Sequence, residues 1–286
     1  MILVDISQIV IANAFAAKFK AARENVVVDE HFVRTMVLNS LRLYNKQFKR
    51  EYGEMVVCFD SKDTWRKKEF PNYKANRKKD DGVLDWPMIF KTLDQIYLDL
   101  KTYFPYKVIK IAGCEADDIM GGLARRQKLS PTDKNVLIIS GDKDMKQLVS
   151  DTVKIFHPID KEFVSVPNPA LFLKELCIRG DKDDGVPNML ADDDCLVTPG
   201  KRQPSIFDKK VEVWVHKDAT EFCENATILK NYWRNCKLID LSNTPVCLQS
   251  KILEEYSIPA NGNQSTITTY FMNNRMRNLM DVINEF

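Results

Sequence analysis

Four short apolar runs, each followed at once by acidic residues, constrain the fold of this chain most strongly. Segments whose apolar residues recur at helical spacing separate them. The runs expected to form strands are 1–5, 55–59, 107–112 and 135–140, and the segments expected to form helices are 7–19, 30–50, 86–104 and 115–127. Strands that alternate with helices are typical of a parallel sheet with helices on both faces. We therefore predict an α/β fold with a doubly wound, mainly parallel sheet.

Acidic side chains follow these predicted strands at the point where each strand ends. They are Asp5, Asp60, Glu115, Asp117, Asp118, Asp142 and Asp144. The carboxyl ends of parallel strands share one edge of a sheet, where such folds place their ligands, so these acids should converge. Two like charges about 4 Å apart repel by about 4 kcal/mol at the effective dielectric of a protein cleft, so the group requires cations. Oxygen ligands favour Mg²⁺ or Mn²⁺. Helix capping explains one acidic pair as well as a metal does, but it explains four strand ends poorly.

A further acidic group follows in residues 180–185, Gly-Asp-Lys-Asp-Asp-Gly. It lacks the spacing and the terminal glutamate of an EF-hand, which argues against a calcium buffer. Asp181 and Asp184 are candidates for a second cation site, and an ordinary solvated turn is the alternative. The acidic run 192–194 has no apolar strand before it, and we interpret it as a solvated loop.

The densest positive stretch of the chain lies between Asp60 and Asp81. Its lysines and arginines could neutralise phosphates, while Trp65, Phe70 and Tyr73 could offer flat faces to unstacked bases. A solvated surface loop is the alternative for a basic run that stands alone. Because this segment follows Asp60, at the sheet edge where the acids are expected to converge, it instead predicts a site for nucleic acid.

Composition excludes several other classes of protein. The 286 residues are 44% hydrophobic and 29% charged, as in ordinary globular proteins, with a net charge of +2. Seven cysteines without a Cys-x-x-Cys pair fit a reducing compartment, and three widely separated histidines give a zinc site little support. No stretch resembles a signal peptide or a membrane span, so we expect a cytoplasmic protein without membrane contact.

After about residue 150 the alternation of strands and helices is lost. Residues 152–156 and 162–166 predict a hairpin, and the segments expected to be helical are 168–178, 218–234, 245–256 and 266–284. We expect residues 1–180 to form the α/β domain, with a basic arch at about 62–82. Residues 181–286 are expected to form a mostly helical domain that contacts duplex nucleic acid and a partner protein.

Four motifs occur in an order that resembles the 5′-nuclease superfamily, which includes flap endonucleases and the 5′-3′ exonuclease domain of bacterial DNA polymerase I. They are residues 70–77 (FPNYKANR), 115–118 (EADD), 140–144 (SGDKD) and 180–187 (GDKDDGVP). Within the superfamily, the chain most resembles the ribonuclease H branch of T-even bacteriophages, over nearly its whole length. One departure is that residues 188–202 do not match the glycine-rich helix-hairpin-helix that grips duplex phosphates in most of the family.

The resemblance implies a role for each candidate residue. The first cation would be held by Asp5, Asp60, Asp117 and Asp142, with Glu115 and Asp118 as direct ligands or immediately behind them. The second would be held by Asp144, Asp181 and Asp184. Lys74 and Arg77 would contact the scissile phosphate. The threaded single strand would be lined by Arg66, Lys67, Tyr73, Lys78 and Lys79.

The implied activity is that of a 5′-3′ exonuclease and ribonuclease H with flap endonuclease activity, which removes RNA primers and adjacent DNA during replication. Two Mg²⁺ ions, with Mn²⁺ as a substitute, would serve phosphodiester hydrolysis. The expected substrates are RNA–DNA hybrid, duplex and flapped DNA. The protein would act as a monomer, with a single-strand DNA-binding protein as a possible partner, in the cytoplasm of a bacterial host if it is viral.

Two rival interpretations remain. A catalytically silent protein that binds branched nucleic acid would keep the basic segment and could lose the acids. A response-regulator-like switch would use Asp5 and Asp60 around Mg²⁺, but it gives no reason for the acids at 115–118, 142–144 and 181–184.

Overall fold

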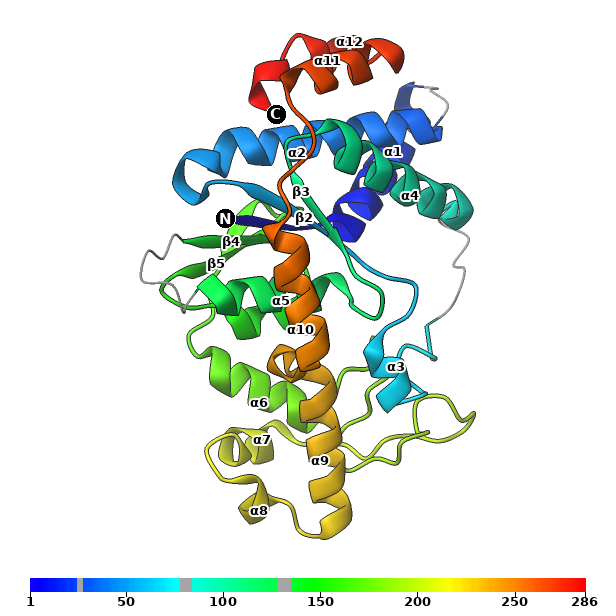
Figure 1. The fold of residues 1–286 in the computed structure, drawn as a ribbon. Coiled ribbons are helices and arrows are strands. Elements are labelled where there is room, and N and C mark those ends of the chain that lie inside the picture. The colour runs from blue at the N-terminus through cyan, green and yellow to red at the C-terminus, as the bar shows by residue number, and fades with distance from the viewer. Residues whose placement is uncertain (25–27, 78–83, 128–134) are drawn as a thin grey trace.

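A six-stranded sheet lies at the centre of the computed structural model, which describes residues 1–24, 28–77, 84–127 and 135–286 (Figure 1). The strands are β1 (Ile2–Asp5), β2 (Met55–Phe59), β3 (Lys107–Lys110), β4 (Val136–Ile139), β5 (Val153–His157) and β6 (Glu162–Val164). Their order is β3-β2-β1-β4-β5-β6, and only the β5–β6 pair is antiparallel. The predicted α/β fold with a mainly parallel sheet is confirmed. The predicted hairpin is present as well, and it extends this sheet because β5 pairs with β4.

Helices cover both faces of the sheet because alternate strand residues point in opposite directions. Ile2 and Val4 belong to a core with α1 (Ile6–Glu24), α2 (Glu30–Tyr52) and α4 (Trp86–Tyr103). Leu3 faces the other side, toward α5 (Ala116–Gln127) and α10 (Val246–Ser257). Strands buried on both faces explain why the apolar runs are continuous rather than alternating.

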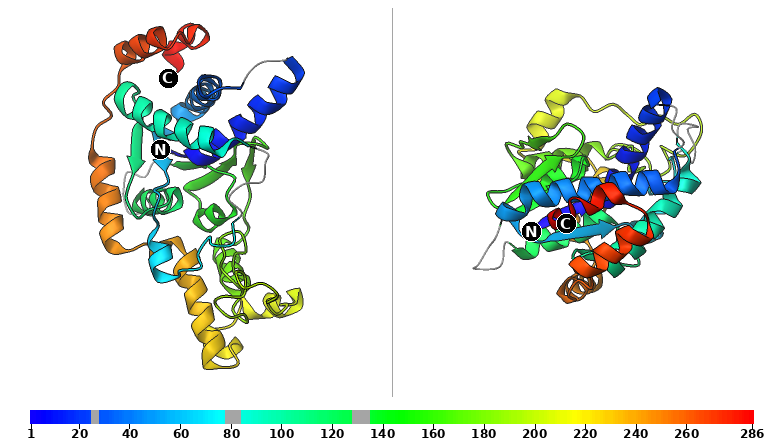
Figure 2. Two further views of the ribbon diagram at one scale, coloured as in Figure 1. Left: turned by 90° about the vertical axis from the view of Figure 1, so that its right-hand side faces the viewer. Right: turned by 90° about the horizontal axis from the view of Figure 1, so that it is seen from above.

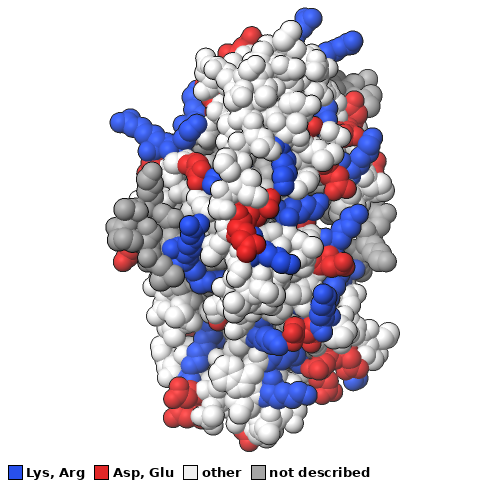
Figure 3. Space-filling model, viewed as in Figure 1, with Lys and Arg blue, Asp and Glu red and all other residues white. Residues whose placement is uncertain are grey.

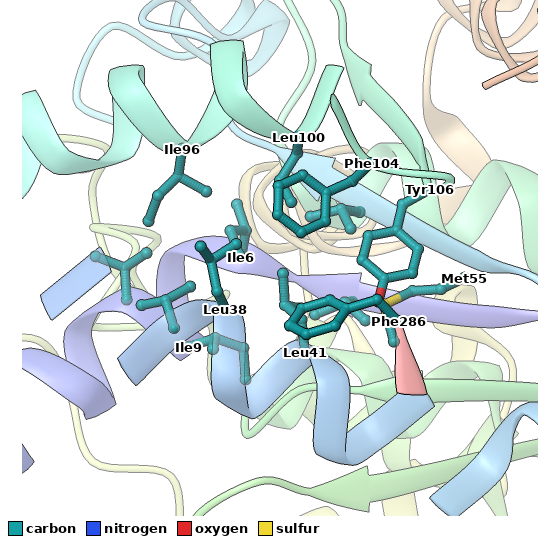
Figure 4. Packing of buried hydrophobic residues seen from close by; sticks show 14 of the residues in the cluster. Ile6, Ile9, Leu38, Leu41, Met55, Ile96, Leu100, Phe104, Tyr106 and Phe286 are labelled. Atoms are coloured by element: carbon teal, nitrogen blue, oxygen red, sulfur yellow. The ribbon is translucent and has the colours of Figure 1, made fainter. Parts of the chain in front are cut away.

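The C-terminal residues return to the α/β core instead of forming a layer of their own. Helices α11 (Gln264–Asn273) and α12 (Arg277–Met280), with the 3₁₀ turn Ile283–Glu285, lie over α2 and α4 (Figures 1 and 2). The ring of Phe286 lies 5.6 Å from that of Phe104, centroid to centroid, beside Tyr106 and Leu41 (Figure 4). The predicted domain boundary at residue 180 stays a prediction.

A third core lies on the side of the sheet that α5 and α10 cover, farther from the strands than these two helices (Figures 1 and 2). It joins α6 (Pro169–Arg179), α7 (Asp208–Trp214), α8 (Ala219–Phe222) and α9 (Ala226–Ile239) to the basic segment through Phe70 and Tyr73. Charged side chains of both signs are interspersed on the face shown in Figure 3, in keeping with the small net charge of +2.

Several predicted elements differ from those in the structure. The predicted helix 218–234 is two helices, because Asn225 accepts a hydrogen bond from the Ile228 amide and starts α9 afresh. The predicted helix 266–284 breaks near Arg275, whose φ is 55°. The sequence patterns did not reveal two short helices, α3 (Trp65–Glu69) and α7. No helix among the described residues is long and apolar enough to cross a membrane.

Candidate active site

The acidic residues that follow the strands lie along one edge of the sheet, as the parallel pairing requires. Asp5 ends β1, Asp60 follows β2, Glu115 and Asp117 follow β3, and Asp142 follows β4. The strand order reverses direction between β1 and β4, so the connections that follow these two strands leave on opposite sides. In open α/β sheets this point of reversal opens a crevice for ligands. The predicted edge is therefore formed by residues that lie far apart in the sequence.

Asp5, Asp60, Asp117 and Asp142 form a group whose members repel one another. Burial and the charges of Asp60 and Asp142 raise the pKa of Asp5 to about 7. Burial, followed by Asp142 and Asp5, raises the pKa of Asp117 well above its usual range. Acids that resist ionisation in this way become stable as carboxylates when a cation lies among them.

Protein donors fix the orientation of this group from outside. The Ser7 hydroxyl donates to Asp60 Oδ2 at 2.7 Å, and the Ala116 amide donates to Asp60 Oδ1 at 2.9 Å. The Ser140 hydroxyl donates to Asp5 Oδ2 at 3.4 Å. None of these three donors is charged, so they orient the carboxylates without neutralising them.

Asp144, Asp181 and Asp184 form a second acidic group, in which one carboxylate oxygen of each lies within 4.8 Å of the others. Asp144 is buried, and its Oδ1 has no hydrogen-bond partner among the residues that the structure describes. Burial and the charges of Asp142, Asp181 and Asp184 raise its pKa well above the usual range. A buried, unpartnered oxygen beside two other carboxylates suits a hard divalent cation.

Asp118 has a different environment from the other acids. Both of its oxygens accept from protein donors: Oδ2 from Arg66 Nη1 at 2.9 Å and the Glu115 amide at 3.0 Å, and Oδ1 from Arg66 Nη2, Trp65 and Thr244. Its side chain is 0% exposed. This geometry excludes Asp118 as a direct ligand, because protein donors occupy both of its oxygens, and leaves the other implied role, a place immediately behind the ligands.

Arg66 does not face a nucleic-acid strand either, because its guanidinium is buried between Asp118 and Glu115. Its Nε donates to the Leu238 carbonyl of α9 at 2.7 Å. Burial disfavours the charge of Arg66, but Asp118, Tyr73 and Glu115 outweigh it and raise the pKa. Arg66 therefore joins α3, α5 and α9, and the prediction that it lines a single strand is wrong.

The aromatic side chains of the basic segment are also buried. Trp65, Phe70 and Tyr73 are all at most 5% exposed, so the proposed stacking of bases on their faces is wrong, and so is the assignment of Tyr73 to the strand. The Tyr73 hydroxyl lies 3.0 Å from Glu115 Oε2 and 2.6 Å from Asp184 Oδ2, and it connects Glu115 to the second acidic group. The sequence could not show whether Tyr73 stacks on bases or is buried against carboxylates, because a tyrosine in a basic segment suits both roles.

Lys74 and Arg77 lie beside the acids, as predicted. The Lys74 ammonium bonds to Glu115 Oε1 and lies 3.6 Å from Asp184 Oδ1. Burial disfavours its charge, but Glu115 and Asp184 together outweigh burial and raise its pKa. Arg77 Nη2 donates to Asp184 Oδ1 at 2.7 Å, while half of its side chain stays exposed. Lys67 is exposed, and Lys78 and Lys79 lie outside the described residues.

Hydrogen bonds to backbone carbonyls join residues 70–77, the basic turn, to residues 180–185, the acidic loop. The Lys74 amide donates to the Asp184 carbonyl at 2.7 Å, and Arg77 Nε donates to the Asp183 carbonyl at 3.0 Å. Lys74 has a φ of 57°, an uncommon conformation for a residue with a side chain. The two segments are more than a hundred residues apart in the chain, yet their contacts place cations beside carboxylates.

Comparisons with known proteins agree with this arrangement. A family described as "5′-3′ exonuclease, N-terminal resolvase-like domain" matches residues 1–175. The chain belongs to the 5′-3′ exonuclease family. A second family, described as "T4 RNase H, C terminal", matches residues 169–286. These matches confirm the superfamily resemblance and its phage branch, and they identify the chain as a nuclease.

Two relatives show how the similarity is distributed along the chain. Ribonuclease H of Enterobacteria phage T4 is 29% identical over 99% of this chain and 95% of its own length. The 5′-3′ exonuclease of Buchnera aphidicola (strain APS) is 31% identical over 54% of this chain, and the match spans 54% of that relative. Several further relatives are likewise matched over about half of this chain or less.

Solved structures share the fold at low sequence identity. The T5 D15 protein co-crystallised with metal ions has a TM-score of 0.60 and 16% identity, with 99% of this chain and 98% of that chain covered. The T5 D15 flap endonuclease in a complex with DNA and metal ions has a TM-score of 0.58 at 16% identity, with the same coverage. At this identity the likeness extends to the fold alone, and it includes the C-terminal helices.

Proposed function

We propose that this nuclease is a 5′-3′ exonuclease and ribonuclease H that also cuts flaps, and that it hydrolyses phosphodiesters with two Mg²⁺ ions. The observation that carries the proposal is the meeting of two acidic groups with Lys74 and Arg77 at one edge of the sheet. Like charges held together in this way favour divalent cations, and cationic side chains next to them favour phosphate.

The residues available fit two divalent ions. Asp5, Asp60, Asp117 and Asp142 would hold one, with Glu115 close behind, while Asp144, Asp181 and Asp184 would hold the other. All the candidate ligand atoms are carboxylate oxygens, which suits Mg²⁺ and allows Mn²⁺ to substitute. Paired ions of this kind supply an activated water and stabilise the charge on the leaving oxygen.

The side chains of the chain itself bind and orient the phosphate. Lys74 stays protonated at neutral pH because Glu115 and Asp184 raise its pKa. Arg77 is half exposed on the same side, so both can offset charge that develops on the phosphoryl oxygens. No side-chain nucleophile is required. Arg66 and Tyr73 act from behind, because they hold Glu115 in place.

The substrates we propose are RNA–DNA hybrid, duplex DNA and flapped DNA, as for primer removal during replication. The names of the T4 and T5 relatives, a ribonuclease H and a flap endonuclease, support this choice. We further propose a monomer that acts in the cytoplasm of a bacterial host, with residues 181–286 contacting duplex and a single-strand DNA-binding protein. Lys67, which is exposed and follows Arg66 in the chain, is the candidate contact to single-stranded nucleic acid among the described residues.

The test is the release of labelled 5′ ends from a primer hybrid and from flapped DNA, with Mg²⁺ and with EDTA. We expect short 5′ products from both substrates in Mg²⁺ and none in EDTA. Binding of flapped DNA without cleavage under any divalent cation would instead support the catalytically silent, branch-binding protein. Cleavage that persists in EDTA would contradict the metal-dependent mechanism.

A further inference from the structure

Lys143 is a cation that the proposed mechanism does not use, and it lies against the second acidic group. It stands between Asp142 and Asp144 in the chain, on the 3₁₀ helix Lys143–Leu148. Its Nζ donates to Asp181 Oδ1 at 2.8 Å and lies 3.4 Å from Asp183 Oδ2. Asp181 is one of the three carboxylates that lie within 4.8 Å of one another. The ammonium therefore contacts a carboxylate group that a second cation would share.

We propose that Lys143 is an internal counter-ion that competes with the second divalent cation for Asp181 and so sets the affinity of that site. This inference rests on the proposed second cation site. It assigns to Lys143 a positioning role, since the ammonium would act on the carboxylate and not on the substrate.

The contacts of Asp181 explain the competition. Its Oδ1 already accepts from Lys143 and from the Asp183 amide at 2.9 Å, which occupies the lone pairs of that oxygen. A cation that binds Oδ1 must displace the ammonium, and one that binds Oδ2 must tolerate a positive charge nearby. At the effective dielectric of a protein cleft, charges about 4 Å apart change a binding constant by more than about tenfold.

The side chain of Lys143 can move away from Asp181, whereas that of the buried Arg66 cannot move away from Asp118 and Glu115. Lys143 is 41% exposed, whereas Arg66 is 3% exposed and bonded to two acids and a carbonyl. A half-exposed lysine can return its ammonium to water at little cost. A phosphate that arrives at the site adds negative charge and favours the divalent cation over the lysine. Occupation of the second site would then depend on bound nucleic acid.

The test measures Mn²⁺ binding to the full chain by isothermal titration calorimetry, without nucleic acid. We expect Lys143→Met to tighten one binding event by at least about tenfold. The matched control is Lys182→Met, which removes an equal charge from an exposed lysine next to Asp181 in the chain. We expect it to change the affinity by less than about threefold, because a solvated charge is screened. Lys143→Arg, which keeps the charge, should bind Mn²⁺ as the wild type does.

The results separate this inference from the proposed site. Equal effects of Lys143→Met and Lys182→Met, or weaker binding in Lys143→Met, would overturn the role of Lys143. Asp184→Asn tests the second cation site itself. Relative to the wild type, it should weaken the Mn²⁺ binding event that Lys143→Met tightens. If Asp184→Asn changes no binding event, the second site is absent and the inference fails with it. Lys143→Gln replaces Lys143→Met if the latter does not fold, as judged by circular dichroism.

Discussion

Asp117 and Asp118 are adjacent in the chain, yet their surroundings differ completely. Consecutive helix residues point about 100° apart. Asp117 therefore faces the other acids, whereas Asp118 faces Arg66 and Thr244. The carboxylate of Asp117 is repelled by Asp142 and Asp5, whereas that of Asp118 accepts hydrogen bonds at both oxygens. Residue type alone does not determine whether an acid can hold a cation, since the direction of the side chain decides it.

The raised pKa of Asp5 predicts a pH dependence of stability. Burial and the charges of Asp60 and Asp142 raise this pKa from 3.8 to about 7. The folded protein therefore holds the proton more tightly than the unfolded chain, and the resulting stability is lost as pH rises from about 4 to about 7. We expect the melting temperature in EDTA to fall across this range by more in the wild type than in Asp5→Asn.

Addition of Mg²⁺ should reverse most of this loss at neutral pH, because the cation favours the ionised acids. Asp192→Asn, which changes an exposed acid away from the group, serves as the control and should behave as the wild type does. Equal pH dependence in Asp5→Asn and the wild type would contradict the assignment.

The buried pair of Arg66 and Asp118 predicts a large loss of stability on mutation. Arg66→Met would leave the fully buried Asp118 without its two guanidinium bonds, and such a loss costs about 3–5 kcal/mol of unfolding free energy. Urea denaturation measures it. Lys67→Met, the exposed neighbour, should change stability by less than about 0.5 kcal/mol. The double variant Arg66→Met with Asp118→Asn should recover part of the loss, and no recovery would argue against the pairing.

At the scale of elements, the contact between the basic turn and the acidic loop depends on Gly185. Its φ is +71°, and an added Cβ would lie 2.8 Å from the Asn72 carbonyl oxygen. Gly185→Ala should therefore separate the turn from the loop and lower the cleavage rate at least about tenfold, because small misplacements of catalytic groups are costly.

Gly200→Ala is the matched control for this effect. Gly200 also has a positive φ, of +82°, but an added Cβ there meets no atom of the described residues within 4 Å. It should pay only the backbone cost of about 1 kcal/mol and cleave at nearly the wild-type rate. Equal losses of activity in the two variants, assayed on the same flapped DNA, would show that the contact has no role.

Helix α11 packs as part of the α/β core rather than as a free docking element. Phe271 is 0% exposed and lies in the core with Phe104 and Phe286, whereas its neighbour Met272 is 65% exposed. Phe271→Ala should cost about 3–5 kcal/mol of unfolding free energy, and Met272→Ala should cost little. Guanidinium denaturation compares them, and a Phe271→Ala variant as stable as Met272→Ala would contradict the packing.

The sequence predicted the sheet well because strand residues are buried on both faces and leave a continuous apolar signal. It predicted the acids of the first group because parallel pairing alone brings strand ends together. It could not predict the return of 264–286 to the core, since an amphipathic helix does not specify its partner. It also could not separate buried aromatic residues from exposed ones in a basic segment, because Phe70 and Tyr73 are buried in a cluster with residues of α6 and α9, far along the chain.

The net charge of the whole molecule is close to zero, at +2, but positive and negative side chains are unevenly distributed at the site. The sheet edge concentrates carboxylates, and the basic turn adjoins them from one side. Such a separation of charge gives a site whose carboxylates attract divalent cations, and the bound cations then attract phosphate. Cleavage and binding should therefore be separable, because removal of one acid impairs the cation site without removing the basic contacts.

One measurement tests this account most directly: the cleavage rate and the DNA affinity of Asp117→Asn and Asp142→Asn on 5′-labelled flapped DNA in Mg²⁺, with the exposed Asp192→Asn as control. We expect both site variants to lose cleavage by at least about a thousandfold, as catalytic groups that act as a unit do, while their affinity for DNA stays within about threefold of the wild type. The control should cleave normally. Full cleavage by either site variant would contradict the claim that acids from separate strands form one cation-dependent centre.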